Sequence, residues 1–254
     1  MKFIVGNLKM NLISEIEREN YFKSFESGLE GKKFKNVKLI ICPPFIHLET
    51  FRKKIDLAKV SLGAQNIHQE ASGRFTGEIS APMVKNFGGD YVIIGHSERR
   101  NYFNEDNEII NKKIKISLKN GLTPIICIGE TANERINGEI KNVISKQLME
   151  GLQDISKTKF SQIIIAYEPV WAIGSGKVPT SDEIMEARIL MQKILADKFD
   201  LTFDKMPQII YGGSVDTKDI KEVCINSGMN GVLVGGESLH VESFIKIAEF
   251  LENN

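Results

Sequence analysis

The chain has 254 residues with 33 basic and 33 acidic side chains, so its formal net charge at pH 7 is zero. No field of the whole molecule favours nucleic acid or an anionic membrane, and any anion site has to be local. Hydrophobic residues make up 42% and charged residues 26%, the composition of a globular protein that can bury a sizeable core.

Short apolar runs rich in β-branched residues recur along the chain, each bounded by Gly, Pro or polar residues. They are Phe3 to Val5, Val37 to Cys42, Val60 to Gly63, Tyr91 to Ile94, Pro124 to Ile128, Ile163 to Tyr167, Gln208 to Tyr211 and Gly231 to Val234. The runs are continuously apolar and do not alternate, which predicts strands buried on both faces, as in parallel sheets.

Stretches with helical periodicity lie between these runs. The segments that begin at Ser14 and Thr180 each have the form of a capping box, and apolar residues at helical spacing follow the second one. Further helices are predicted from Asn107 to Lys119, Ile140 to Leu152, Asp219 to Ile225 and Val241 to Leu251.

Strand and helix therefore alternate in units of about 32 residues, which predicts a closed (β/α)8 barrel of the α/β class. The whole chain, residues 1–254, is expected to form this single domain. A doubly wound open sheet is the alternative on periodicity alone. Such sheets usually have a glycine-rich turn after the first strand, whereas Gly6 to Asn11 contains no G-x-G-x-x-G pattern. The barrel is therefore preferred.

Chemistry in such a barrel takes place at the carboxyl ends of the strands. The chemically distinctive residues at these ends are Asn7, Lys9, His96, Glu98, Glu168, Gly212, Gly213, Ser214, Gly235 and Gly236. A carboxylate, an imidazole, an ammonium group and glycine-rich backbone together suit proton transfer beside a carbonyl in a phosphorylated compound. Each residue alone is more often structural, and the glycines alone are more often tight turns. The prediction depends on the barrel bringing them to one rim.

Other reactions lack their motifs. Val178 follows Gly176-Lys177 where a Walker A loop needs Ser or Thr, and no G-x-S-x-G elbow is present. The four histidines contain no H-x-x-x-H pair, so we expect no metal. Ile173 to Gly176 lies between stiffer ends and predicts a mobile lid, with a rigid turn as the alternative.

Segments along nearly the whole chain resemble the triosephosphate isomerase family, in the same order. They are Gly6 to Asn11, Gly63 to Asn66, Phe75 to Ser80, Gly95 to Arg100, Cys127 to Glu130, Tyr167 to Gly174, Tyr211 to Val215 and Leu233 to Gly236. The resemblance implies a (β/α)8 barrel that interconverts D-glyceraldehyde 3-phosphate and dihydroxyacetone phosphate through an enediolate, in glycolysis and gluconeogenesis.

The resemblance also implies residue roles. Glu168 would be the base, neutral His96 would polarise the carbonyl and shuttle protons, and Lys9 would offset the developing charge. Asn7 would hold Lys9 in place, with Glu98 nearby. The substrate would bind to Asn7 and Lys9, and its phosphate to N–H groups near Gly174, Ser214, Gly235 and Gly236, under a lid from Pro169 to Pro179. The reaction moves only protons, so no cofactor is required.

Members of this family are usually homodimers in which the loop around Phe75 and Thr76 inserts beside the partner's first active-site loop, so we expect a homodimer. The three cysteines form no C-x-x-C pair, which favours a reducing, cytoplasmic location. No apolar run reaches membrane-spanning length and the net charge is zero, so we expect neither a membrane nor a nucleic-acid partner.

Four residues depart from the family pattern: Leu8, Arg74, Ser175 and Glu237 stand where Trp, Ala, Thr and Ala are usual. Glu237 adds a negative charge beside the expected phosphate site. Two other functions are weighed: a non-catalytic phosphate-binding barrel, and another phosphosugar enzyme such as an aldolase or epimerase. The latter would need a Schiff-base lysine or metal ligands, whereas the sixth strand ends in Glu168.

Overall fold

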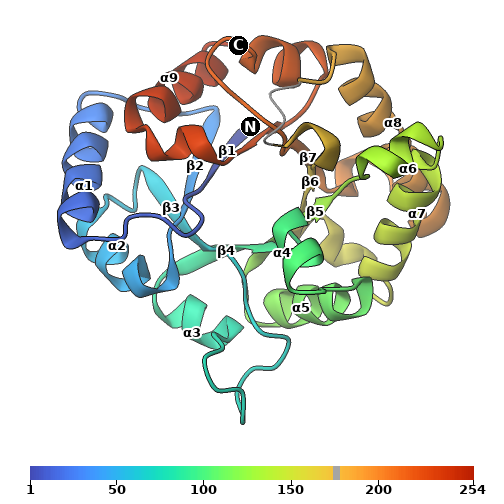
Figure 1. Ribbon diagram of the computed structural model, residues 1–254, viewed down its shortest axis with the longest axis horizontal. Coiled ribbons are helices and arrows are strands. Elements are labelled where there is room, and N and C mark those ends of the chain that lie inside the picture. The colour runs from blue at the N-terminus through green and yellow to red at the C-terminus, as the bar shows by residue number, and fades with distance from the viewer. Residues whose placement is uncertain (174–177) are drawn as a thin grey trace.

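In a computed structural model, which describes residues 1–173 and 178–254, parallel strands form a closed barrel (Figure 1). They are β1 (Lys2–Asn7), β2 (Val37–Cys42), β3 (Val60–Ala64), β4 (Gly89–Ile94), β5 (Thr123–Ile128), β6 (Ile164–Tyr167), β7 (Gln208–Tyr211) and β8 (Gly231–Val234). β1 pairs with both β2 and β8, which closes the sheet. The predicted (β/α)8 barrel is confirmed, and the open sheet is excluded.

Helices surround the barrel and connect its strands (Figure 1). They are α1 (Glu15–Leu29), α2 (Leu48–Lys54), α3 (Ala81–Asn86), α4 (Ser97–Tyr102), α5 (Asn107–Lys119), α6 (Ala132–Ile136), α7 (Ile140–Gly151), α8 (Ser181–Phe199) and α9 (Val241–Glu252). Both predicted capping boxes are present, at Ser14 with Glu17 and at Thr180 with Glu183. No helix in the described part of the chain is long and apolar enough to cross a membrane.

The connection after β7 differs from its prediction. The segment expected to be helical from Asp219 to Ile225 has a π-helical turn over Lys221–Asn226. Val223 and Cys224 in this turn are buried against the outer wall of the barrel. The wider turn therefore still presents an apolar face to the barrel.

Two apolar cores lie on either side of the barrel wall. In β2, Ile40 and Cys42 belong to the inner cluster, whereas Leu39 and Ile41 belong to the outer cluster beneath the helices. Successive strand residues point to opposite faces, so continuous apolar runs are what such a wall requires. The prediction that the strands are buried on both faces is confirmed.

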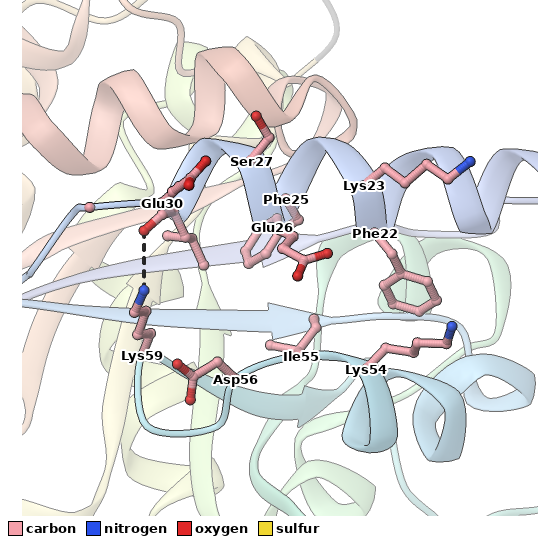
Figure 2. A pocket seen from close by; sticks show the side chains of 12 residues that line it. Phe22, Lys23, Phe25, Glu26, Ser27, Glu30, Lys54, Ile55, Asp56 and Lys59 are labelled. Atoms are coloured by element: carbon pink, nitrogen blue, oxygen red, sulfur yellow. Dashed lines mark hydrogen bonds between the residues drawn. The ribbon is translucent and has the colours of Figure 1, made fainter.

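The outer wall is hollowed between α1 and the segment that leads from α2 into β3 (Figure 2). Phe22, Phe25 and Ile55 form the apolar part of this cavity of about 570 Å³. Lys59 closes one end by donating a hydrogen bond from Nζ to the Leu29 carbonyl at 3.2 Å (Figure 2). None of the predicted site residues lines this cavity.

Candidate active site

A second cavity, of about 440 Å³, lies at the carboxyl ends of the strands. The sequence candidates that line it are Asn7, Lys9, His96, Gly212, Gly213, Ser214, Gly235 and Gly236. They end or follow β1, β4, β7 and β8, strands that closure of the barrel brings together. Glu98 and Glu168 do not line the cavity, but each contacts a residue that does.

Lys9 has a left-handed backbone with φ of 50°, which a lysine adopts only when its surroundings hold it there. Its N–H donates to Asn7 Oδ1 at 3.1 Å, and its carbonyl accepts from Gln65 Nε2 at 2.8 Å. Lys9 Nζ lies 2.5 Å from Glu98 Oε1. Backbone and side-chain contacts together fix the ammonium group at the wall of the cavity.

His96 stands at the N-terminus of α4 and is buried. Its Nδ1 accepts a hydrogen bond from the Glu98 N–H at 3.2 Å, and an accepting nitrogen carries no proton. The hydrogen-bond pattern therefore assigns a neutral imidazole with its proton on Nε2. Nε2 is the nitrogen that lies 3.2 Å from Glu168 Oε1.

Glu168 follows β6 and is 1% exposed. Its Oε2 accepts a hydrogen bond from the Ser97 N–H at 2.9 Å. The approach of His96 Nε2 to Oε1 lacks hydrogen-bond geometry, so among the described residues Oε1 has no hydrogen-bond partner. Burial and this carboxylate raise the pKa of Cys127 well above its usual range, which keeps the adjacent thiol neutral. Glu168 thus presents one unpaired, buried carboxylate oxygen.

The expected phosphate side of the cavity contains open backbone. Gly236 is exposed, and a Cβ atom there would meet nothing within 4 Å. At Gly235 a Cβ atom would lie 3.4 Å from Lys9 Cε, so this backbone is close to the ammonium group. Ser214 donates from Oγ to the Ala172 carbonyl at 3.3 Å, which joins the segments after β6 and β7. Gly174 lies outside the described residues, as do residues 175–177 of the predicted lid, whereas the rest of the lid from Pro169 to Pro179 is described.

The other two glycines of the expected phosphate cradle are required by packing. At Gly212 a Cβ atom would stand 2.9 Å from Glu168 Cγ, and at Gly213 it would stand 2.2 Å from the Tyr211 hydroxyl. Both positions exclude a side chain, so neither glycine needs a phosphate to explain it. Burial raises the pKa of Tyr211 above its usual range, so this phenol is neutral.

Three of the departures from the family pattern lie in the described residues. Leu8 is fully buried in the outer core, where an apolar side chain is suited. Arg74 is exposed in the loop after β3. Glu237 lines the site cavity, and its carboxylate has no hydrogen-bond or ion-pair partner among the described residues. Ser175 lies outside the described residues. In the described part of the chain, no three His, Cys, Asp or Glu side chains group as metal ligands.

Gln65, Ser97 and Gly129 contribute to the site although the sequence did not single them out for a role. Gln65 holds the Lys9 carbonyl, and Ser97 donates its N–H to Glu168. Gly129 allows the Glu168 carbonyl to approach, because a Cβ atom there would lie 1.7 Å from that oxygen. Their sequence signals are their position next to strand ends and their place in segments that resemble the family.

Ionisable side chains and a cavity at the carboxyl ends of a closed parallel barrel define a (β/α)8-barrel enzyme. Residues 2–251 match the model of the triosephosphate isomerase family. Similar proteins named triosephosphate isomerase include those of Dictyoglomus thermophilum, 43% identical over 98% of both chains, and Endomicrobium trichonymphae, 42% identical over 97% of both chains. That of Porphyromonas gingivalis is 41% identical, also over 97% of both chains. The chain belongs to the triosephosphate isomerase family, which gives no support to a non-catalytic barrel.

Proposed function

We propose that the chain interconverts D-glyceraldehyde 3-phosphate and dihydroxyacetone phosphate, a step of glycolysis and gluconeogenesis. Family membership supports this reaction. The single structural observation behind it is the unpaired Glu168 Oε1 beside the protonated nitrogen of His96, next to a cavity that Lys9 lines. A base, a neutral proton donor and a cation are the groups that an enediolate intermediate requires.

In the proposed reaction, Glu168 removes a proton from C1 of dihydroxyacetone phosphate and returns it to C2. The electron pair released from the C–H bond forms the C1–C2 double bond of the enediolate, and the carbonyl π pair moves to O2, which takes the proton of His96 Nε2. Nε2 then takes the proton of the C1 hydroxyl, so that a carbonyl forms at C1 while C2 receives the proton held by Glu168. Lys9 offsets the charge on that oxygen, while Glu98 and Asn7 hold Lys9 in position. Glu168 does not line the cavity, so its carboxylate has to turn away from Ser97 for this step.

The phosphate would bind at the backbone of Gly235 and Gly236 and at Ser214, with Gly174 as the further predicted contact. Gly235 and Gly236 bring backbone to the cavity without side chains. The Ser238 hydroxyl donates to the carbonyls of Asn7 and Gly235 and so does not compete with the phosphate for the backbone N–H groups. Backbone N–H groups at such a turn can approach an oxyanion closely.

The activity is tested by assaying purified chain with either triose phosphate in the presence of a chelator. We expect chelator-resistant isomerisation whose kcat falls by about 1000-fold or more in Glu168→Gln, because an amide cannot act as the base. Glu26→Gln, on the outer face of α1, is the matched control and should keep wild-type activity. A folded wild type without isomerase activity would refute the proposal.

We further propose that the chain forms a homodimer through the Phe75 and Thr76 loop. This loop follows β3 and projects from the barrel, with Phe75 exposed (Figure 1). Large apolar side chains in the connections after β1 and β2 are also exposed, with Met10 at 93%, Ile13 at 88% and Ile46 at 80%. These connections leave the carboxyl ends of β1, β2 and β3, which are adjacent strands. Exposed apolar side chains gathered at one end of a fold are a usual mark of a protein interface.

Sedimentation velocity of Phe75→Asp tests the dimer. A buried carboxylate without a partner opposes association, so the variant should sediment as a monomer where the wild type sediments as a dimer. Phe203→Asp removes an equally apolar side chain, 82% exposed, from the connection between α8 and β7, and should remain dimeric. A dimeric Phe75→Asp would contradict the proposed interface.

Two coarser expectations complete the proposal. We infer that residues 1–254 form one domain, because α9 near the C-terminus packs against α1 and β1 near the N-terminus. We place the protein in the cytoplasm, as its free cysteines, Cys42, Cys127 and Cys224, are buried thiols of the kind found in reducing compartments.

A further inference from the structure

Glu130 is a fully buried carboxylate that holds the chain on both sides of Glu168. It follows β5, and its oxygens accept hydrogen bonds from the Tyr167 hydroxyl at 3.1 and 3.2 Å and from Trp171 Nε1 at 2.8 Å. Its backbone carbonyl accepts the Val170 N–H at 3.0 Å. Tyr167, which precedes the proposed base, and Val170 and Trp171, which follow it, therefore all hydrogen-bond to Glu130.

Arg135 of α6 pairs with this carboxylate and reaches further. Its Nη1 lies 3.0 Å from Glu130 Oε1, and its guanidinium stacks on the Trp171 ring at 4.5 Å from the ring centre. Its Nη2 donates to Glu183 at 2.6 Å, and Glu183 is the capping-box residue of α8. Arg135 thus contacts both the segment that leaves β6 and the first turn of α8. Among the described residues, no other cation contacts Glu130.

We propose that Arg135 is a positioning residue for Glu168: it neutralises Glu130 and covers Trp171, and so fixes the backbone that carries the base. This inference rests on the proposed function. A buried carboxylate that loses its cation rearranges or draws in water, because an unpaired buried charge is unfavourable. Tyr167 and Trp171 would then lose their common acceptor, and the segment between them would be held less firmly.

Kinetics of Arg135→Met test the effect on the base. Methionine keeps apolar bulk but removes the charge and the forked donor. A shift of about 1 Å at a reacting group costs about 100-fold in rate, so we expect kcat to fall by about 10- to 100-fold with KM nearly unchanged. Arg135→Lys retains one charged contact but cannot bridge Glu130 and Glu183, so its kcat should lie between that of the wild type and that of Arg135→Met.

A second readout does not depend on activity. Trp171 is the single tryptophan of the chain, so intrinsic fluorescence reports on it alone. In Arg135→Met we expect stronger quenching of this emission by acrylamide, because the guanidinium no longer covers the ring. Arg188→Met is the matched control: Arg188 of α8 contacts Ser227 and Gln192, and its loss should change neither kcat nor quenching.

A double variant separates positioning from a general loss of stability. With Glu130→Gln the buried charge is absent, so adding Arg135→Met should lower kcat by less than it does in the wild type. Three outcomes would each overturn the positioning role of Arg135. They are additive effects of Glu130→Gln and Arg135→Met on kcat, a wild-type kcat in Arg135→Met, and a lowered kcat in Arg135→Met without stronger acrylamide quenching. If Arg135→Met does not fold, the same two measurements, kcat and acrylamide quenching of Trp171, are made on Arg135→Lys and interpreted in the same way. A wild type without isomerase activity would instead refute the proposed function.

Discussion

Two glycines determine where the proposed base can stand. Gly129 after β5 and Gly212 after β7 flank Glu168, and a Cβ atom at either would collide with it, at its carbonyl oxygen and its Cγ respectively. Neighbouring strands of a closed barrel lie about 4.8 Å apart, so their ends approach closely. The position of Glu168 thus depends on the absence of a side chain at Gly129 and Gly212 as well as on the contacts that Ser97 and Glu130 make.

Glu237 is the residue at which this chain is expected to differ in substrate affinity from its family. Glu237 lines the site cavity next to Gly236, and among the described residues its carboxylate has no hydrogen-bond or ion-pair partner. Two unit charges about 4 Å apart repel each other by about 1 kcal/mol in water, which corresponds to about five-fold in affinity, so Glu237→Ala and Glu237→Gln should lower KM by about five-fold at low salt. Steady-state kinetics with glyceraldehyde 3-phosphate measure this.

Salt provides the control for that prediction. Since added ions screen the repulsion, the difference in KM between wild type and Glu237→Gln should shrink at about 1 M salt. Glu26→Gln removes a carboxylate that lines the outer cavity beside α1 and not the site cavity, and it should leave KM unchanged at both salt concentrations. An unchanged KM in Glu237→Gln at low salt would show that the carboxylate points away from the phosphate.

The sequence indicates candidate residues but not their contacts. Lys9, His96 and Glu168 could be selected because each ends or follows an apolar run, and only barrel closure was needed to bring them together. Gln65 lies in the family-like segment Gly63 to Asn66, but its role could not be predicted, because its bond to the Lys9 carbonyl spans 56 positions and an amide has no motif of its own. The same holds for Ser97, whose contribution is a backbone N–H.

Among the elements, strands were easier to predict than short helices. Burial on both faces makes every strand a continuous apolar run, and the predicted bounds differ from those observed by at most two residues at either end. Helices α2, α3, α4 and α6 have five to seven residues, too few for a recurring apolar face. Such short helices are stabilised by packing and caps more than by their own propensity.

The side chain of Thr180 stabilises the N-terminus of α8 as its N-cap. Thr180 Oγ1 accepts the Glu183 N–H, and the Glu183 carboxylate accepts the Thr180 N–H at 2.8 Å. Thr180→Ala removes one half of this box and should lower the free energy of unfolding by about 1 kcal/mol, measured by urea denaturation. Thr180→Ser, which keeps the hydroxyl, should stay within about 0.5 kcal/mol of the wild type. Equal losses in both variants would exclude the cap as the cause.

At the scale of the whole molecule, closure of the barrel buries ionisable groups that the sequence alone presents as ordinary. Cys42 and Cys127 belong to the inner core, and Cys224 to the outer one. Burial raises the pKa of all three thiols, that of Cys224 from 9.0 to about 11. Composition showed only that three cysteines exist, whereas their resistance to ionisation comes from packing between distant strands and helices.

This packing predicts that the fold weakens in alkali. Above about pH 9 the unfolded chain releases thiol protons that the folded chain retains, so the free energy of unfolding decreases as pH rises, by up to about 1.4 kcal/mol per pH unit for each thiol. For Cys224 the decrease extends from about pH 9 to about pH 11. Urea denaturation at fixed protein concentration measures it, and a single transition is expected for one domain.

Cys224→Ala isolates one thiol from the remaining titrating groups. The variant should be less stable than the wild type at pH 7, because a small cavity replaces the buried sulfur. Its stability should nevertheless fall less steeply between about pH 9 and about pH 11, since one of the retained protons is gone. Parallel curves for the two proteins would mean that Cys224 ionises equally in the folded and unfolded chains, and the alkaline loss would then have to come from Cys42, Cys127 and the buried tyrosines.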